Sequence, residues 1–154
     1  MKQYGTIMES YYRNYSTLHT TKQALTRVLA KKLCLGGSRR AEVILRTTLR
    51  CLCMHLPGEE IGALAFKLPT GMKCWANAKS TAGGRSDLHN LLQELKDCCG
   101  FRSMEEALVA AKSAISVLGL VVDLSEFGRL LPEELHELAL QVKEEQLALL
   151  RQRP

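Results

Sequence analysis

The sequence LAFKLP at residues 64–69 has a counterpart 63 residues further along the chain, FGRLLP at residues 127–132. Both stretches close the same order of features: an amphipathic segment, a glycine-containing turn, a long serine-capped segment, a short segment and Leu-Pro. The long segments align better at an offset of 66, so the second copy has the shorter connection before its Leu-Pro. Half of a 154-residue chain is too small to bury a full core by itself. We therefore expect two similar helical halves that pack about a pseudo-twofold axis.

The spacing of apolar residues predicts that both halves are helical. From Thr21 to Leu33, apolar residues recur every three or four positions, which is the period of an amphipathic helix. The segments that follow the double glycine, Ser103 and Pro132 show the same period. Leu and Ala dominate the apolar residues, and only 5% of the chain is aromatic, a composition that favours packed helices over a sheet. The sequence therefore predicts an all-α fold with a long C-terminal helix that reaches residue 152.

The expected organisation is one helical domain preceded by a short head. Residues 1–19 are polar and hold all four tyrosines, so they are either a docking segment or a frayed tail. Residues 20–154 are predicted to form a single all-helical domain. Within that domain, the first repeat covers about 20–75, a small polar linker covers 76–86, and the second repeat covers about 87–140.

Charge is distributed unevenly along the chain, although the net charge is only +5. Residues 1–50 hold ten Lys and Arg against two acidic residues, whereas residues 81–154 hold eight against twelve. The basic first half could attract an acidic protein, a phosphate backbone or the acidic second half of another copy. A solvated surface that binds nothing is the alternative interpretation. The cations expected to contact a partner are Lys31, Lys32, Arg39 and Arg40.

Two further groups of residues are candidates for contact with a partner. Tyrosine is favoured at interfaces because it combines an apolar ring with a polar hydroxyl. Leu147 and Leu150, near the end of the last helix, would be exposed on one half alone, so they are candidates for partner docking or self-association. Capping the protein's own core is the alternative role of these leucines. The candidate tyrosines of the head are Tyr4, Tyr11, Tyr12 and Tyr15.

The sequence CLCMH at residues 51–55 looks like a metal site, but its spacing does not support one. In a helix, Cys51 and His55 share a flank while Cys53 lies about 160° around from Cys51. Three ligands therefore cannot converge on one ion, and Cys53 is expected to pack in the core as a small apolar residue. Nor does any cysteine pair have the C-x₂-C spacing of structural zinc. We predict no bound metal, and a thiol- or metal-dependent regulator ranks third among the hypotheses.

Sequence motifs of catalysis are missing from the chain. The patterns G-x-S-x-G, H-E-x-x-H, the Walker motif and G-x-G-x-x-G do not occur. We therefore expect no catalytic residue, no cofactor and no enzymatic activity. Six cysteines without a secretory signal predict reduced thiols in the cytoplasm. The sequence also lacks the stretch of about 18 apolar residues that a membrane span needs.

The stretch from Leu52 to Pro69 carries a family resemblance. It resembles the bacterial domain-of-unknown-function family 2267, whose first half reads roughly L-x-x-x-L-P-G-E-E-A-x-x-L-A-x-Q-L-P. The second half of that family has an acidic residue a few positions before another Leu-Pro, similar to Glu126 in this chain. The resemblance covers roughly residues 22–140. It implies an all-helical domain of two repeats, and it implies no known activity.

A second resemblance concerns residues 22–52, KQALTRVLAKKLCLGGSRRAEVILRTTLRCL. They are similar to the opening two helices of the histone-like bacterial DNA-bending proteins. Those proteins continue into a β-ribbon whose basic arms enter the minor groove, whereas this chain continues into another helix and Leu-Pro. A non-enzymatic interaction, adaptor or assembly module is therefore the primary hypothesis. A nucleic-acid-associated protein that uses the basic first repeat is the alternative.

Overall fold

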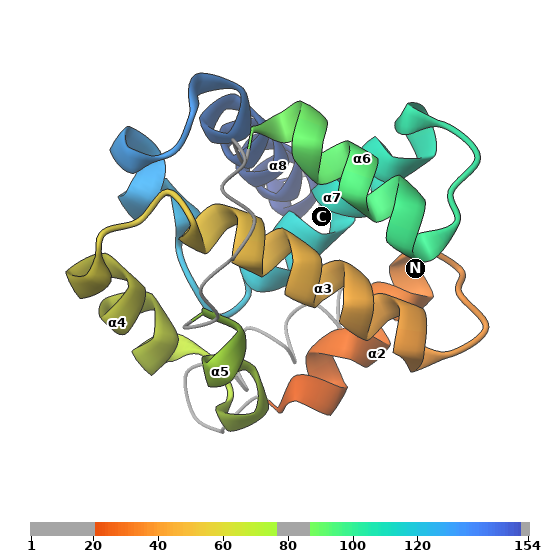
Figure 1. Cartoon of the computed structure of the whole chain (residues 1–154), viewed down its shortest axis with the longest axis horizontal. Coiled ribbons are helices and arrows are strands. Elements are labelled where there is room, and N and C mark those ends of the chain that lie inside the picture. Colours follow the sequence, from red (N-terminus) through yellow and green to blue (C-terminus); the bar gives the residue numbers. More distant parts are fainter. Residues whose placement is uncertain (1–20, 77–86, 152–154) are drawn as a thin grey trace.

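A computed structural model describes residues 21–76 and 87–151 of the chain (Figure 1). These residues form helices joined by short turns, without a strand in either range, which confirms the predicted all-α fold. In order along the chain, with η marking a 3-10 helix, the elements are α2 (Lys22–Lys32), α3 (Ser38–Cys53), α4 (Gly58–Lys67), η1 (Thr70–Met72), α5 (Lys73–Ala76), α6 (Leu88–Cys99), α7 (Met104–Leu118), η2 (Leu124–Leu130) and α8 (Glu133–Arg151).

Helices α2 and α7 begin where the capping residues predict, whereas the serine cap expected for the first long helix is wrong: Ser38 is the first residue of α3, and no side chain of the described residues caps the first turn of that helix. The Thr21 hydroxyl oxygen accepts a hydrogen bond from the Ala24 N–H at 3.0 Å, and the Ser103 hydroxyl accepts one from the Glu106 N–H at 3.2 Å. Each side chain thereby satisfies a backbone donor that the first helical turn leaves unpaired. Ala76, the first residue of the predicted linker, is the buried last residue of α5. The rest of that linker and the predicted head lie outside the described residues.

Helix α7 is at the centre of the fold. It packs against α2, α3, α6 and α8, and it runs behind α3 in the view of Figure 1. Eight of its 15 residues are buried, and four of the eight are alanines. Small side chains at a helix contact let the neighbouring backbones approach closely. Because α3 and α8 both pack on α7 but have no extensive contact with each other, their outer sides face different directions.

The two Leu-Pro steps have the same backbone conformation. Leu68 follows α4 at φ −80° and ψ 151°, and Leu131 follows η2 at φ −87° and ψ 149°. The extended conformation results from the next residue, because a proline ring clashes with a helical predecessor. Both leucines are buried. The order of helix, turn, long helix, short helix and Leu-Pro is therefore common to the two halves, while the pseudo-twofold axis itself stays a prediction.

Cys51 and Cys53 are both core residues in the last turn of α3. Burial, together with the carboxylates of Glu94 and Asp87, raises the pKa of Cys51 to about 12, and burial raises the pKa of Cys53 to about 11. The inward position of Cys53 agrees with the prediction. Cys51, which we expected on a flank beside His55, is buried as well, and the carboxylates that act on it belong to α6 and its N-cap residue. Across the part of the chain that the structure describes, no three His, Cys, Asp or Glu side chains are grouped to hold a metal ion.

The longest described helix, α8, is amphipathic rather than uniformly apolar. Its buried residues are Leu135, Leu138, Ala139 and Val142, which share one side of the first three turns. Glutamates occupy much of the opposite side. Within residues 21–76 and 87–151, no helix has the length and apolar character that a membrane span requires.

Candidate interaction surfaces

The last two turns of α8 are only partly covered by the rest of the protein. Leu149 follows the buried Val142 by seven residues, so both side chains lie on the same side of the helix. Leu149 is nevertheless 64% exposed, although its neighbour Leu150 is half-buried. The C-terminal part of this helix is therefore accessible to another molecule.

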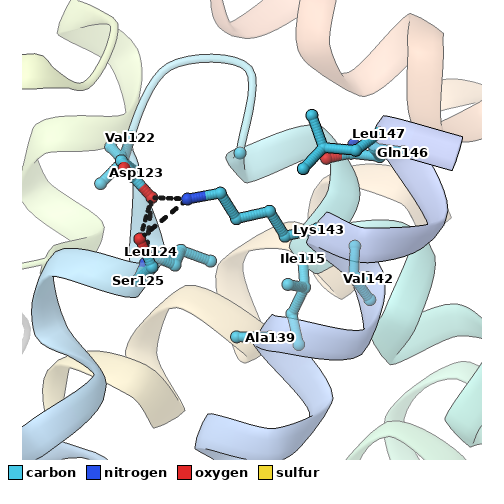
Figure 2. A pocket seen from close by; sticks show the side chains of 11 residues that line it. Ile115, Val122, Asp123, Leu124, Ser125, Ala139, Val142, Lys143, Gln146 and Leu147 are labelled. Atoms are coloured by element: carbon cyan, nitrogen blue, oxygen red, sulfur yellow. Dashed lines mark hydrogen bonds and ion pairs between the residues drawn. The ribbon is translucent and has the colours of Figure 1, made fainter. Parts of the chain in front are cut away.

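A groove of about 200 Å³ lies beside α8, between the end of α7 and the start of η2 (Figure 2). A cavity of about 150 Å³ holds a benzene ring, so the groove has room for an apolar side chain of a partner. Its apolar lining residues are Ile115, Val122, Leu124, Ala139, Val142 and Leu147.

Lys143 spans the mouth of this groove (Figure 2). Its Nζ donates a hydrogen bond to the Ser125 hydroxyl at 3.1 Å and lies 3.5 Å from Asp123 Oδ1. The Ser125 hydroxyl in turn donates to Asp123 Oδ1 at 2.6 Å, and the Ser125 N–H donates to the same oxygen at 3.1 Å. These bonds from Ser125, with a smaller contribution from Lys143, hold the pKa of Asp123 below its usual value. The groove therefore combines apolar walls with a fixed, charged rim.

Ser116 joins α2, α7 and α8 through a buried hydroxyl. Its oxygen accepts hydrogen bonds from Lys32 Nζ at 2.9 Å and from Gln146 Nε2 at 2.6 Å. The Ser116 carbonyl also accepts from Gln146 Nε2, at 3.1 Å. Desolvation lowers the pKa of Lys32, and the charge of Glu145 opposes this shift. Although Lys32 remains exposed as a residue, its ammonium group is directed into the protein and not toward a partner.

A hydrogen-bonded serine and lysine also occur as a catalytic pair in some hydrolases. Here the serine is only 5% exposed and lies within a helix, where its hydroxyl already accepts two hydrogen bonds. A substrate carbonyl could not reach Ser116 without opening the contact between α2, α7 and α8. We therefore assign this pair a structural role.

The outer sides of α2 and α3 carry cations without an acidic partner. Arg27 and Lys31 are exposed and lie four residues apart on α2, so they share a side of that helix. Arg39 and Arg46 are exposed and lie seven residues apart on α3. None of the four forms an ion pair with a carboxylate in the described ranges. We name these four residues the basic face.

Other cations of the first half are already engaged. Glu42 binds Lys22 at 2.9 Å, and the Arg50 guanidinium lies 3.4 Å from a carboxylate oxygen of α6. Arg40 donates to the backbone carbonyl of Cys99, and its guanidinium lies 5.4 Å from the centre of the Phe101 ring. Of the four cations predicted to contact a partner, Lys31 and Arg39 therefore face outward, while Lys32 and Arg40 contact the protein itself.

The structure also exposes apolar residues that the sequence did not single out. Leu140 on α8 is 38% exposed, and the predicted Leu147 is 42% exposed one heptad later. Leu150 is half-buried. Phe66 on α4 is 84% exposed and lies beneath the ammonium group of Lys73, 5.9 Å from its ring centre. The heptad spacing between Leu140 and Leu147 was the available signal for Leu140. For Phe66 the signal was its position two residues after the buried Leu64, about 160° around the helix from it.

The predicted tyrosines of the head, Tyr4, Tyr11, Tyr12 and Tyr15, lie outside the described residues. No protein-family model matches the chain, and neither a curated protein nor a solved structure matches it significantly. The resemblance to the domain-of-unknown-function family 2267 therefore stays a prediction. What the protein does has to be inferred from the surfaces that it presents.

Proposed function

We propose that this protein is a non-enzymatic interaction module that brings partners together through two surfaces. The observation that carries the proposal is the exposure of Leu140 and Leu147 on α8, where Leu147 also lines an apolar groove. Leucines that are exposed together next to a groove are typical of a protein contact surface. Lys143 and Asp123 at the mouth of the groove would orient a partner by its polar groups.

The basic face is the second surface. Its four cations lack counter-ions in the described part of the chain, so they attract an acidic partner. The two surfaces lie on different helices, the leucines on α8 and the cations on α2 and α3, so each can bind a partner of its own. An adaptor or assembly module needs this arrangement, since it must hold one partner while it binds another.

An acidic protein suits the basic face better than a nucleic acid does. Lys32 bonds to the buried Ser116 and Arg40 bonds to the Cys99 carbonyl, which leaves fewer cations for phosphate contacts. The one ring near them, that of Phe101, is covered by Arg40, so it is not available to stack on a base. A nucleic-acid-associated protein remains the alternative.

Capture from extracts of the native cell tests the proposal. The full chain is the bait, the extract is treated with nuclease, and bound proteins are quantified by mass spectrometry. Leu140→Glu with Leu147→Glu changes the α8 surface, and Arg39→Glu with Arg46→Glu changes the basic face. We expect each pair of substitutions to release a distinct set of proteins.

Matched controls separate these surfaces from general effects of charge. Val109→Glu alters an exposed valine on α7, and Arg102→Glu with Arg129→Glu reverses two exposed arginines elsewhere. Both controls should retain all of the captured proteins. Capture that is the same for every variant would overturn the proposal.

Titration with duplex DNA tests the alternative. We expect no binding at a physiological ionic strength of about 0.15 M. If DNA binds, if its affinity falls steeply with salt, and if reversal of Arg39 and Arg46 abolishes it, then the partner of the basic face is nucleic acid.

A further inference from the structure

We infer that the partner at the α8 surface is a second copy of this chain, whose α8 packs antiparallel against the first. The inference rests on the proposed function, because it assigns an occupant to the same exposed leucines. It is supported by the apolar spacing, the charge pattern and the symmetry of the outer side of α8.

The outer side of α8 carries a second apolar strip, separate from the buried one. The strip consists of Leu140, Lys143, Leu147 and Leu150, at alternating intervals of three and four residues. This is the spacing of a coiled-coil seam. With a turn of about 100° per residue, the four positions span only about 80° of the helix circumference. We name this strip the α8 seam.

The two ends of α8 carry opposite charges beside the seam. Glu137 and Arg151 are both exposed, and each lies seven residues from Glu144. When two α8 helices run antiparallel about a twofold axis near Glu144, Glu137 of each copy faces Arg151 of the other. A parallel pairing would place like charges opposite each other instead. Neither residue has an ion-pair partner in the described part of its own chain, so both are available.

The same axis brings the apolar residues together. Leu140 then faces Leu150 of the second copy, and Leu147 faces the aliphatic stem of Lys143 of the second copy. Lys143 can pack its stem in this way while its ammonium group stays on Ser125 and Asp123. The two Glu144 side chains approach each other near the axis, where their exposed carboxylates stay in solvent and their repulsion is screened. The pairing also covers the mouth of the groove.

The symmetry of this contact limits the assembly to two chains. Each copy offers the same patch to the other, so the interface is isologous and closes after one pairing. Pairing of the basic face with the acidic second half of another copy is the competing form of self-association. That contact would be heterologous and would continue into rings or filaments. It would also depend on Arg39 and Arg46, which the α8 pairing does not use.

Sedimentation equilibrium of the purified full chain tests the inference. The expected mass is twice 17.2 kDa at concentrations where the dimer forms. Leu140→Glu with Leu147→Glu should give a monomer, because it places two charges in the seam. Leu149→Glu is the matched control: it makes the same change on the same helix, at a more exposed leucine that lies about 160° around from Leu147. This control should remain dimeric, and circular dichroism should show unchanged helix content in all variants.

A charge exchange tests the antiparallel direction. Glu137→Arg alone and Arg151→Glu alone should each weaken dimerisation about tenfold, because each creates two repulsive pairs per dimer. Glu137→Arg combined with Arg151→Glu should restore the affinity, since it exchanges the partners within each pair. Failure of the double variant to recover would overturn the antiparallel arrangement.

Further outcomes separate this inference from the proposed function. A wild-type chain that stays monomeric at every concentration would overturn the inference, as would equal disruption by Leu149→Glu. Loss of the dimer in Arg39→Glu with Arg46→Glu would indicate the head-to-tail contact instead. If the purified chain is a monomer but the seam variant still loses partners from the cell extract, the inference fails and the proposed function stands.

Discussion

The imidazole ring of His136 lies directly on the backbone of Gly128. A β-carbon built at position 128 would come within 2.2 Å of His136 Cε1 and 2.3 Å of Nδ1. Gly128 belongs to η2 and His136 to the first turn of α8, so this contact joins the two elements. The Nδ1 atom of His136 is buried and has no hydrogen-bond partner among the described residues. The position of the ring therefore depends on packing against glycine.

Gly128→Ala should destabilise the fold by about 1–3 kcal/mol, because the added methyl group forces the ring out of its place. Urea denaturation of the full chain measures the change in the free energy of unfolding. In a His136→Ala background, the same substitution should cost much less, since the space is already empty. An equal cost in both backgrounds would show that the ring does not require the glycine.

Ser116→Ala should destabilise the fold by about 1–3 kcal/mol, because it leaves partly buried donors of Lys32 and Gln146 without their hydroxyl acceptor. Thermal and urea unfolding measure this cost. Ser113→Ala, at a half-buried position on the same helix, is the control and should change stability by less than about 0.5 kcal/mol. Similar values for both serines would contradict the role given to the junction of α2, α7 and α8.

Five of the six cysteines should react with a thiol reagent in two distinct groups. Cys34, Cys74 and Cys98 are exposed and should be modified quickly at pH 8. Cys51 and Cys53 should be protected, because their thiols are buried and their pKa values are raised to about 12 and about 11. Mass spectrometry of a timed reaction assigns each site. In denaturant, the protection of both core cysteines should disappear, and fast modification of Cys51 in the folded protein would contradict its buried position.

Asp123 should contribute to stability in a pH-dependent way. Its pKa in the fold lies below the usual 3.8, so the ionised carboxylate favours the folded state. This contribution is present above pH 3.8 and is lost as the pH falls through the lowered pKa. Unfolding of the wild type and of Asp123→Asn should therefore differ at neutral pH and converge in acid. Because the side chain is half-exposed, the difference should be small, and a parallel offset at all pH values would contradict this origin.

The helices could be predicted from the sequence because their signals are local. Apolar residues at intervals of three and four define each helix, and Thr21 and Ser103 mark two of the starts by a hydrogen bond to a residue three positions later. The recurring Leu-Pro likewise predicts the end of a helix, since the effect of proline on the conformation of the preceding residue needs no tertiary contact.

The surfaces could be predicted only in part, because tertiary contacts decide which side chains remain available. Lys31 and Lys32 are neighbours in sequence, yet Lys32 is directed inward by its hydrogen bond to Ser116, whereas Lys31 faces outward. Arg39 and Arg40 differ in the same way, since only Arg40 reaches the end of α6. The groove is built from three elements that are separated in the sequence, so no local pattern marks it.

Site-specific photo-crosslinking in the native cell tests the interaction surface on α8 most directly. A photoreactive amino acid replaces Leu147 in the α8 seam or, as a control, the exposed Val109 on α7. We predict a discrete adduct from position 147, with the mass of two chains where a second copy is bound, and no adduct from position 109. The absence of an adduct at position 147, or the same adducts from both positions, would contradict the assignment of α8 as a contact surface.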